Sequence, residues 1–166
     1  MEPFVGRKLD LVVYGCTAAG FLGGPDGNAS MVEVLERRTG AKVVSTAGAM
    51  EVVLKHEGVK ETAVVTPYLP AVNEGLRSYL DHAAVSVEVL GSFLCQTTTE
   101  LGQITEAQVR DKALATVTVE SQTLFIVCSQ LPTLTVFPEL RAKLGIPVRS
   151  SIQATAWAAE RALALA

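Results

Sequence analysis

The sequence lacks the features that nucleic-acid-binding and membrane-spanning proteins need. Its 166 residues carry a net charge of −3 and contain no block of basic residues, which argues against phosphate binding because a polyanion needs a cationic surface. Aromatic residues make up only 5% of the chain, so base-stacking platforms are few. No apolar run approaches the roughly 20 residues of a membrane span, and the start lacks the apolar core of a secretory signal. We therefore expect neither nucleic acid nor a membrane as a partner.

Cysteine and histidine are also scarce. Three cysteines and two histidines stand at scattered positions, without a CxxC pair or a Cys/His cluster. Structural zinc sites and disulfide frameworks need such spacings, so we expect no metal, reduced thiols and a cytoplasmic location. Cys95 has no counterpart elsewhere in the chain, and we interpret it as structural. Apolar residues, in contrast, make up 49% of the sequence, enough to bury a sizeable core.

Six apolar, β-branched segments of strand length alternate with helical patterns. Most of them are continuous apolar runs, which is typical of strands covered on both faces. Strands that alternate with helices predict parallel βαβ units and an α/β fold, here as flavodoxin-like lobes. The predicted strands lie at 9–15, 41–46, 61–68, 85–90, 123–129 and 146–151.

Capping residues set the predicted helix boundaries. One helix has a cap at Asn28 or Ser30 and a stop at Gly40, and another begins at a Thr105 cap. The glycines of "GFLGGPDGN" are interpreted as a tight loop before the first of these helices. They do not fit a phosphate-binding loop, because the Lys-Ser/Thr ending and the GxGxxG spacing are both missing.

A weak internal repeat organises the chain. "LVVYGCTA" and "LFIVCSQL" each put a cysteine and then a hydroxyl residue at a strand end, and a helix, a glycine, a short strand, a Ser-Thr or Ser-Ser pair and a further helix follow. A full strand–helix–strand–helix passage precedes the second copy, so the first copy lacks an opening passage of about 50 residues by the chain's own symmetry. We predict a pseudo-twofold pair of lobes: an incomplete one at 1–58, a second at 59–151, and a helix at 152–166 that packs on the first.

The repeat places Cys16 and Cys128 at equivalent strand ends, where open α/β sheets bind ligands. Two thiols facing each other across one carbon can act on its opposite faces, and a thiol pKa of about 8.5 lies within reach of neutral pH. Each cysteine is followed by a predicted helix, whose N-terminus would stabilise a thiolate. Thr17, Ser129 and Tyr68 supply donors for a carboxylate. The alternative is that the cysteines pack as small hydrophobic residues and Tyr68 as a strand-end residue.

With "VVSTAGAM", "AVVTPYLPAVNEGL" and "LGIPVRSSIQATAWAA", these motifs resemble the cofactor-independent aspartate/glutamate racemase superfamily, in its maleate cis–trans isomerase and arylmalonate decarboxylase branch. The resemblance implies that Cys16 is the nucleophile or base and Cys128 the proton donor, without a cofactor. It implies that Thr17, Tyr68 and Ser129 bind the substrate carboxylate. It also implies an N-terminal βα passage that this sequence lacks, which would impair activity.

The sequence leaves three functions open. The first is isomerisation or racemisation of a small carboxylate, above all a maleate-like dicarboxylate, by two opposed cysteines. The second is decarboxylation of a substituted malonate by Cys128 alone; glycine at the position of Cys16 in the decarboxylases argues against it. The third is a non-catalytic α/β module with buried, unreactive thiols. The oligomeric state is left open, a homodimer being one option.

Overall fold

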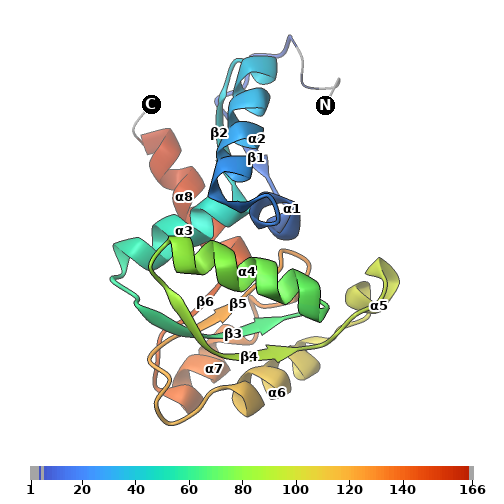
Figure 1. The fold of residues 1–166 in the computed structure, drawn as a ribbon, viewed down its shortest axis with the longest axis vertical. Coiled ribbons are helices and arrows are strands. Elements are labelled where there is room, and N and C mark those ends of the chain that lie inside the picture. Colours follow the sequence, from blue (N-terminus) through green and yellow to red (C-terminus); the bar gives the residue numbers. More distant parts are fainter. Residues whose placement is uncertain (1–3, 5, 165–166) are drawn as a thin grey trace.

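The computed structural model describes residue 4 and residues 6–164 as two parallel sheets with helices packed on them (Figure 1). All six predicted strands are present, which confirms the α/β expectation. They are β1 (Leu11–Tyr14), β2 (Lys42–Ser45), β3 (Glu61–Thr66), β4 (Ser86–Ser92), β5 (Leu124–Ile126) and β6 (Val148–Ser150). The helices are α1 (Thr17–Phe21), α2 (Gly24–Thr39), α3 (Thr46–His56), α4 (Pro70–His82), α5 (Thr98–Gly102), α6 (Glu106–Thr116), α7 (Phe137–Leu144) and α8 (Ser151–Ala164).

The larger sheet has the order β4-β3-β5-β6, with every neighbouring pair parallel. This is the start of the flavodoxin-like order, in which the first strand lies between the second and third. Alternate residues of a strand point to opposite faces. Val64 therefore joins the core beneath α3 and α4, whereas Ala63 and Val65 join the core beneath α6 and α7. Both faces of β3 are buried, as its continuous apolar run predicts.

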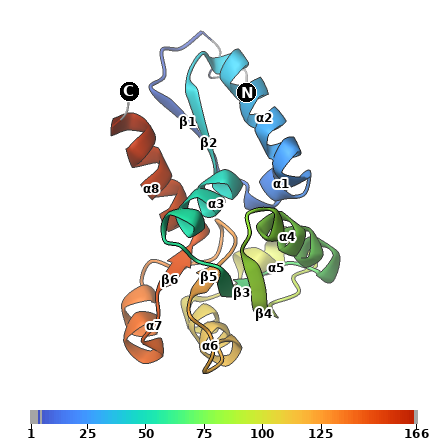
Figure 2. The same ribbon diagram turned by 60° about the vertical axis from the view of Figure 1, so that its left-hand side comes forward.

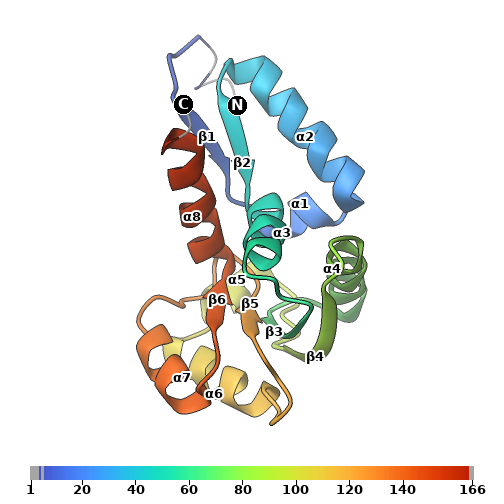
Figure 3. The same cartoon turned by 90° about the vertical axis from the view of Figure 1, so that its left-hand side faces the viewer.

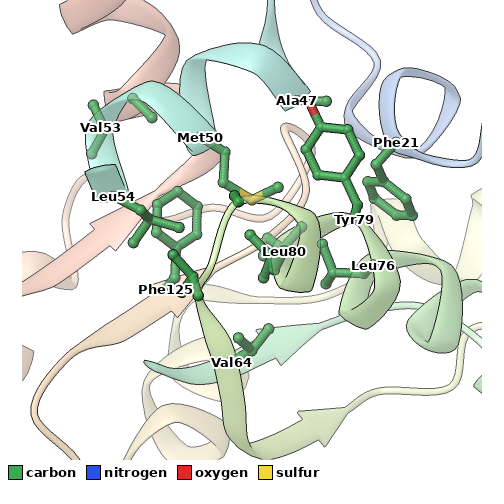
Figure 4. Packing of buried hydrophobic residues seen from close by; sticks show 14 of the residues in the cluster. Phe21, Ala47, Met50, Val53, Leu54, Val64, Leu76, Tyr79, Leu80 and Phe125 are labelled. Carbon is green, nitrogen blue, oxygen red and sulfur yellow. The ribbon is translucent and has the colours of Figure 1, made fainter. Parts of the chain in front are cut away.

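The first of these cores joins the two parts of the molecule. Helix α3, which follows the small sheet, packs its buried side chains on helix α4 and on the larger sheet (Figure 4). Burying such side chains is worth about 1.5–3 kcal/mol each, so this shared core couples the stability of the two sheets. Its labelled members include Met50 and Leu54 of α3, Leu76 and Leu80 of α4, Val64 of β3 and Phe125 of β5.

In the smaller sheet β1 pairs with β2 in parallel register, and no other strand of residues 6–164 joins them. Helices α2 and α8 lie on opposite sides of this strand pair (Figure 3). Val13 in β1 nevertheless stays 47% exposed, so the expectation of strands covered on both faces is wrong for β1. The apolar run shows that the strand is suited to burial, but it does not specify which neighbours cover it.

Helix α2 begins earlier than its sequence predicts. It starts at Gly24 with Pro25 in its first turn, and neither Asn28 nor Ser30 caps it. The side chain of Asn28 instead accepts a hydrogen bond from Ser45 at 2.8 Å, seventeen residues away. The predicted loop is therefore mostly helix, because proline is well accommodated in a first helical turn.

The predicted helix stop at Gly40 is confirmed. Gly40 ends α2 in the left-handed conformation with φ of 69°, and Gly145 ends α7 in the same way with φ of 67°. Glycine adopts this conformation without the steric cost that a side chain imposes. The two helices occupy equivalent places in the repeat, so the repeat extends to the capping of its helices.

Helix α8 lies beside α3 and packs on α3, β1 and β2 (Figure 2). Residues 165 and 166 of the predicted helix lie outside the described residues. No helix within residues 6–164 combines the length and the apolar composition that crossing a bilayer requires. We retain 1–58 and 59–151 as the proposed lobes, with α8 contributing to the first.

Candidate functional site

The ends of β1 and β5 lie next to each other, although they are more than a hundred residues apart in the sequence. β1 leads through Gly15 to Cys16, and β5 leads through Val127 to Cys128. The hydroxyl of Ser129 donates a hydrogen bond to the carbonyl of Gly15. A residue directly after one cysteine is thus bonded to a residue directly before the other, which brings the two strand ends into one site.

Cys128 is held in an unusual backbone conformation. Its φ is +137°, in a region that favours glycine. Strained backbone of this kind costs about 1–3 kcal/mol and is concentrated at functional sites. The Cys128 N–H donates to the hydroxyl of Ser151 at 3.2 Å, at the start of α8. The conformation is therefore maintained by a contact from the next strand–helix junction.

Cys128 is 6% exposed, and this burial raises the pKa of its thiol. Backbone N–H groups of Gln130 and Leu131 and the phenol of Tyr68 act in the opposite direction, and a charge on Cys16 would raise the pKa further. Since burial dominates, the thiol holds its proton at neutral pH. Cys16, in contrast, is exposed. The site thus pairs an accessible thiol with a buried thiol that can serve as an acid.

Tyr68 lies near both cysteines and Thr17. Burial raises the pKa of its phenol, and its interaction with Cys128 and a charge on Cys16 raise it further. The ring packs edge-on against Phe21 of α1 at 5.8 Å between ring centres. The phenol therefore stays protonated and can donate a hydrogen bond to an anion at the two cysteines.

Thr17 is the first residue of α1 and is only 2% exposed. Its hydroxyl lies close enough to Tyr68 to lower the phenol pKa, yet its Oγ1 has no partner of proper hydrogen-bond geometry among the residues that the structure describes. A buried hydroxyl without a partner carries a free-energy cost of about 1–3 kcal/mol. Such a group beside a tyrosine and two thiols is suited to accept a ligand that would satisfy it.

Two details at the predicted site differ from the sequence expectations. No helix directly follows Cys128, because α7 begins only at Phe137; the N–H groups of Gln130 and Leu131 stabilise the thiolate instead. The Ser129 hydroxyl donates its hydrogen to Gly15, so only its oxygen lone pairs and backbone N–H remain for a ligand.

Cys95 and the cavities complete the surroundings. Cys95 is half-buried, and burial raises its pKa, with smaller contributions from charges on Glu100 and Cys128.

A cavity of about 400 Å³ includes Ser129 in its wall. A larger cavity of about 500 Å³, between α3, β6, α7 and α8, has none of the predicted site residues in its lining. Volume alone therefore does not locate the chemistry.

Sequence reasoning missed the polar residues that support this site. Ser151 contacts Cys128, while Asn73 and Ser92 both bond to the backbone of Tyr68. Asn73 lies inside α4, where asparagine is a poor helix former, and that signal could have marked it. Ser92 has no such signal, because its role depends on a contact across two strands.

Comparison with known proteins places the chain in a family. A family model described as arylmalonate decarboxylase matches residues 7–166. The chain therefore belongs to the arylmalonate decarboxylase family, and the predicted branch of the aspartate/glutamate racemase superfamily is confirmed.

Two curated relatives match most of the chain. It is 29% identical over 162 residues to a maleate isomerase from Nocardia farcinica, covering 94% of this chain and 64% of the relative. It is 30% identical over 152 residues to an arylmalonate decarboxylase from Bordetella bronchiseptica, covering 87% of this chain and 61% of the relative. The chain thus spans less than two thirds of the length of either relative.

The fold agrees with solved structures of both kinds of enzyme. One is a cysteine-to-serine mutant of the Nocardia farcinica maleate cis–trans isomerase with a covalently bound succinylcysteine intermediate. It matches with a TM-score of 0.87 at 26% identity, over 93% of this chain and 65% of that one. The parallel α/β architecture expected from the sequence is confirmed.

Proposed function

We propose that this chain carries the catalytic residues of a cofactor-independent isomerase that acts on a small dicarboxylate of the maleate type. The observation that supports this most is that an exposed thiol, Cys16, and a buried thiol, Cys128, follow the adjoining ends of β1 and β5, where burial raises the pKa of Cys128. Single thiols are common in protein cores, but two unlike thiols at equivalent strand ends are suited to addition and protonation.

The reaction proceeds by addition and reversal. The thiolate of Cys16 forms an S–C bond to one alkene carbon, and the electron pair of the double bond takes the proton of Cys128 at the other carbon. The resulting succinyl thioether has a single bond that rotates. The Cys128 thiolate then removes the proton, the double bond re-forms in the trans geometry, and the S–C bond breaks to return the Cys16 thiolate. The succinylcysteine described for the Nocardia farcinica enzyme is the corresponding intermediate.

The carboxylate of the substrate is held by hydrogen-bond donors around the thiols. The Thr17 hydroxyl, which has no partner within the described part of the chain, donates to one oxygen, and the Tyr68 phenol donates to the other. The Ser129 backbone N–H is the third donor, because its hydroxyl already bonds to Gly15. Donors fixed before the reaction stabilise negative charge as it develops on the substrate.

The test compares three cysteine variants on maleate, with fumarate formation followed by proton NMR. Cys16→Ser and Cys128→Ser should each lower kcat by at least about a hundredfold, as loss of a nucleophile or an acid does. Cys95→Ser is the matched control, a third cysteine outside the proposed reaction, and should keep the rate. Equal rates in all variants would refute the two-thiol assignment.

The same variants distinguish the related activity. If Cys128→Ser abolishes turnover of an aryl-substituted malonate while Cys16→Ser does not, the protein is a decarboxylase that uses Cys128 alone. The family model and the Bordetella bronchiseptica relative favour this second candidate. The exposed thiol of Cys16 favours the isomerase. It also disagrees with a non-catalytic module, which predicts buried thiols at both positions.

The remaining parts of the proposal concern surroundings and assembly. We place the enzyme in the cytoplasm, because Cys16, Cys95 and Cys128 are all free thiols. The proposed reaction needs no cofactor, since both bond changes use protein thiols. A homodimer is the proposed assembly to test, by light scattering of the purified chain.

A further inference from the structure

Three polar side chains enclose the peptide of Tyr68. Thr66 at the end of β3 donates to Asn73 Oδ1 at 2.7 Å, and Asn73 Nδ2 donates to the Tyr68 carbonyl at 3.0 Å. Ser92 at the end of β4 donates to the same carbonyl. The Tyr68 N–H donates back to Thr66 Oγ1 at 3.3 Å. Both backbone polar groups of Tyr68 are thus bonded to side chains from three elements, which we call the Tyr68 network (Thr66, Asn73 and Ser92).

The Tyr68 network is buried and closely satisfied. Thr66 is fully buried and Asn73 is 6% exposed. Burying such polar groups is unfavourable unless each one is hydrogen-bonded. Backbone bonds from Phe93 to Thr66 and from Cys95 to Pro67 hold the flanking segment as well. The hydrogen bonds of the Thr66 and Asn73 side chains are not part of the regular backbone bonding of a helix or strand. They belong to the turn between β3 and α4.

The turn determines where the Tyr68 phenol lies. Tyr68 packs against the core cluster that contains Cys128, and Phe21 packs against its ring. The phenol also lowers the pKa of the Cys128 thiol. Because the ring is long, a small rotation of the Tyr68 peptide moves the phenol oxygen far more than the backbone. The peptide bonded by the network is therefore the point from which the phenol is aimed at Cys128.

We propose that Thr66, Asn73 and Ser92 are positioning residues that hold the Tyr68 phenol against the Cys128 thiol and the carboxylate-binding position. The part of this inference that concerns substrate rests on the proposed function. The part that concerns Cys128 does not, because the phenol stabilises the Cys128 thiolate whether or not a dicarboxylate is the substrate.

The test measures alkylation of Cys128 by iodoacetamide as a function of pH. The chain carries Cys16→Ser and Cys95→Ser, so that Cys128 is the single thiol. Thr66→Val keeps the shape of the side chain and removes the hydroxyl. We expect it to slow alkylation near pH 8 by about three- to tenfold, the effect of losing one hydrogen bond to the thiolate. Tyr68→Phe should slow it to the same degree.

The matched control is Thr62→Val. Thr62 lies in the same strand and is equally buried, and its hydroxyl donates to the carbonyls of Ala63 and Thr123, away from Tyr68. We expect no change in the alkylation profile. In the Tyr68→Phe background, Thr66→Val should add nothing, since both changes remove the same interaction. Thr66→Ser, which keeps the hydroxyl, should restore the original profile.

Two results would overturn the proposal. One is an equal shift with Thr62→Val, which would mean general loosening of the fold. The other is an additive effect of Thr66→Val and Tyr68→Phe. If Thr66→Val fails to fold, Ser92→Ala tests the same point at a half-buried position, because Ser92 also donates to the Tyr68 carbonyl. Absence of isomerase activity in the chain with all three cysteines intact would refute the proposed substrate but leave this alkylation result unaffected.

Discussion

The backbone strain at Cys128 can be measured as a free energy. Its φ of +137° disfavours any side chain with a Cβ. We therefore compare Cys128→Ala with Cys128→Gly. Both variants lose the sulfur, so their difference reports only the Cβ and its backbone restriction.

The expected magnitude follows from three contributions. At an ordinary buried position, replacing alanine by glycine costs about 0.5–1 kcal/mol of chain entropy and about 0.8 kcal/mol of lost burial. Release of the backbone strain at position 128 should raise the free energy of unfolding of the glycine variant by about 1–3 kcal/mol. We expect the stability of Cys128→Gly to lie between about 0.8 kcal/mol below and about 1.7 kcal/mol above that of Cys128→Ala.

Urea unfolding with a matched control tests this expectation. Ala63 is fully buried in β3 and has no positive φ. Ala63→Gly should therefore lower the free energy of unfolding by about 1.5 kcal/mol. That cost corresponds to a shift in the urea midpoint of about 0.5–1.5 M. If Cys128→Gly is less stable than Cys128→Ala by the same amount as this control, the reasoning is refuted.

Four further predictions concern stability, each measured by urea unfolding. Ala84→Gly should stabilise the protein by about 0.5–1 kcal/mol, since Ala84 is exposed and has φ of 58°. Leu80→Ala should cost about 2–5 kcal/mol because Leu80 is fully buried, whereas the exposed Leu134→Ala should change stability by less than about 0.5 kcal/mol. Thr105→Ala should cost about 1 kcal/mol by removing the capping box of α6. Since burial raises the pKa of Cys128, the unfolded chain loses this proton first above about pH 8.5, and Cys128→Ala should reduce the loss of stability seen there.

The sequence was sufficient to locate the strands and the paired cysteines. Apolar, β-branched runs of the right length are local signals, and the position of Cys128 relative to its strand is fixed by chain order alone. The start of α2 was misplaced because Asn28 is a strong cap locally, but its actual partner is Ser45. A local pattern carries no information on a bond seventeen residues away.

The fine geometry of the site was beyond sequence reasoning for the same reason. The φ of Cys128 is positive although cysteine does not favour this conformation, so the residue type does not predict it. The Tyr68 network needs β3, α4 and β4 together. Such features arise from tertiary contacts that override local preference.

The two copies of the repeat use equivalent hydroxyl residues in opposite ways. At the first copy, Thr46 donates to the carbonyl of Tyr14, before Cys16. At the second, Ser151 accepts from the N–H of Cys128 itself. Cys16 consequently has an ordinary extended backbone with φ of −94° and stays exposed, whereas Cys128 is turned into the interior.

This asymmetry is what the proposed reaction needs. Two interacting thiols lose their protons in successive steps, and the surroundings of each thiol decide which one keeps its proton. Burial raises the pKa of Cys128, which keeps its proton available, while the exposed Cys16 can reach the substrate as a nucleophile. Replacing Ser151 with alanine would leave the N–H of Cys128 without a partner, and the reaction of Cys128 with iodoacetamide near pH 8 should then become faster as the thiol becomes less buried.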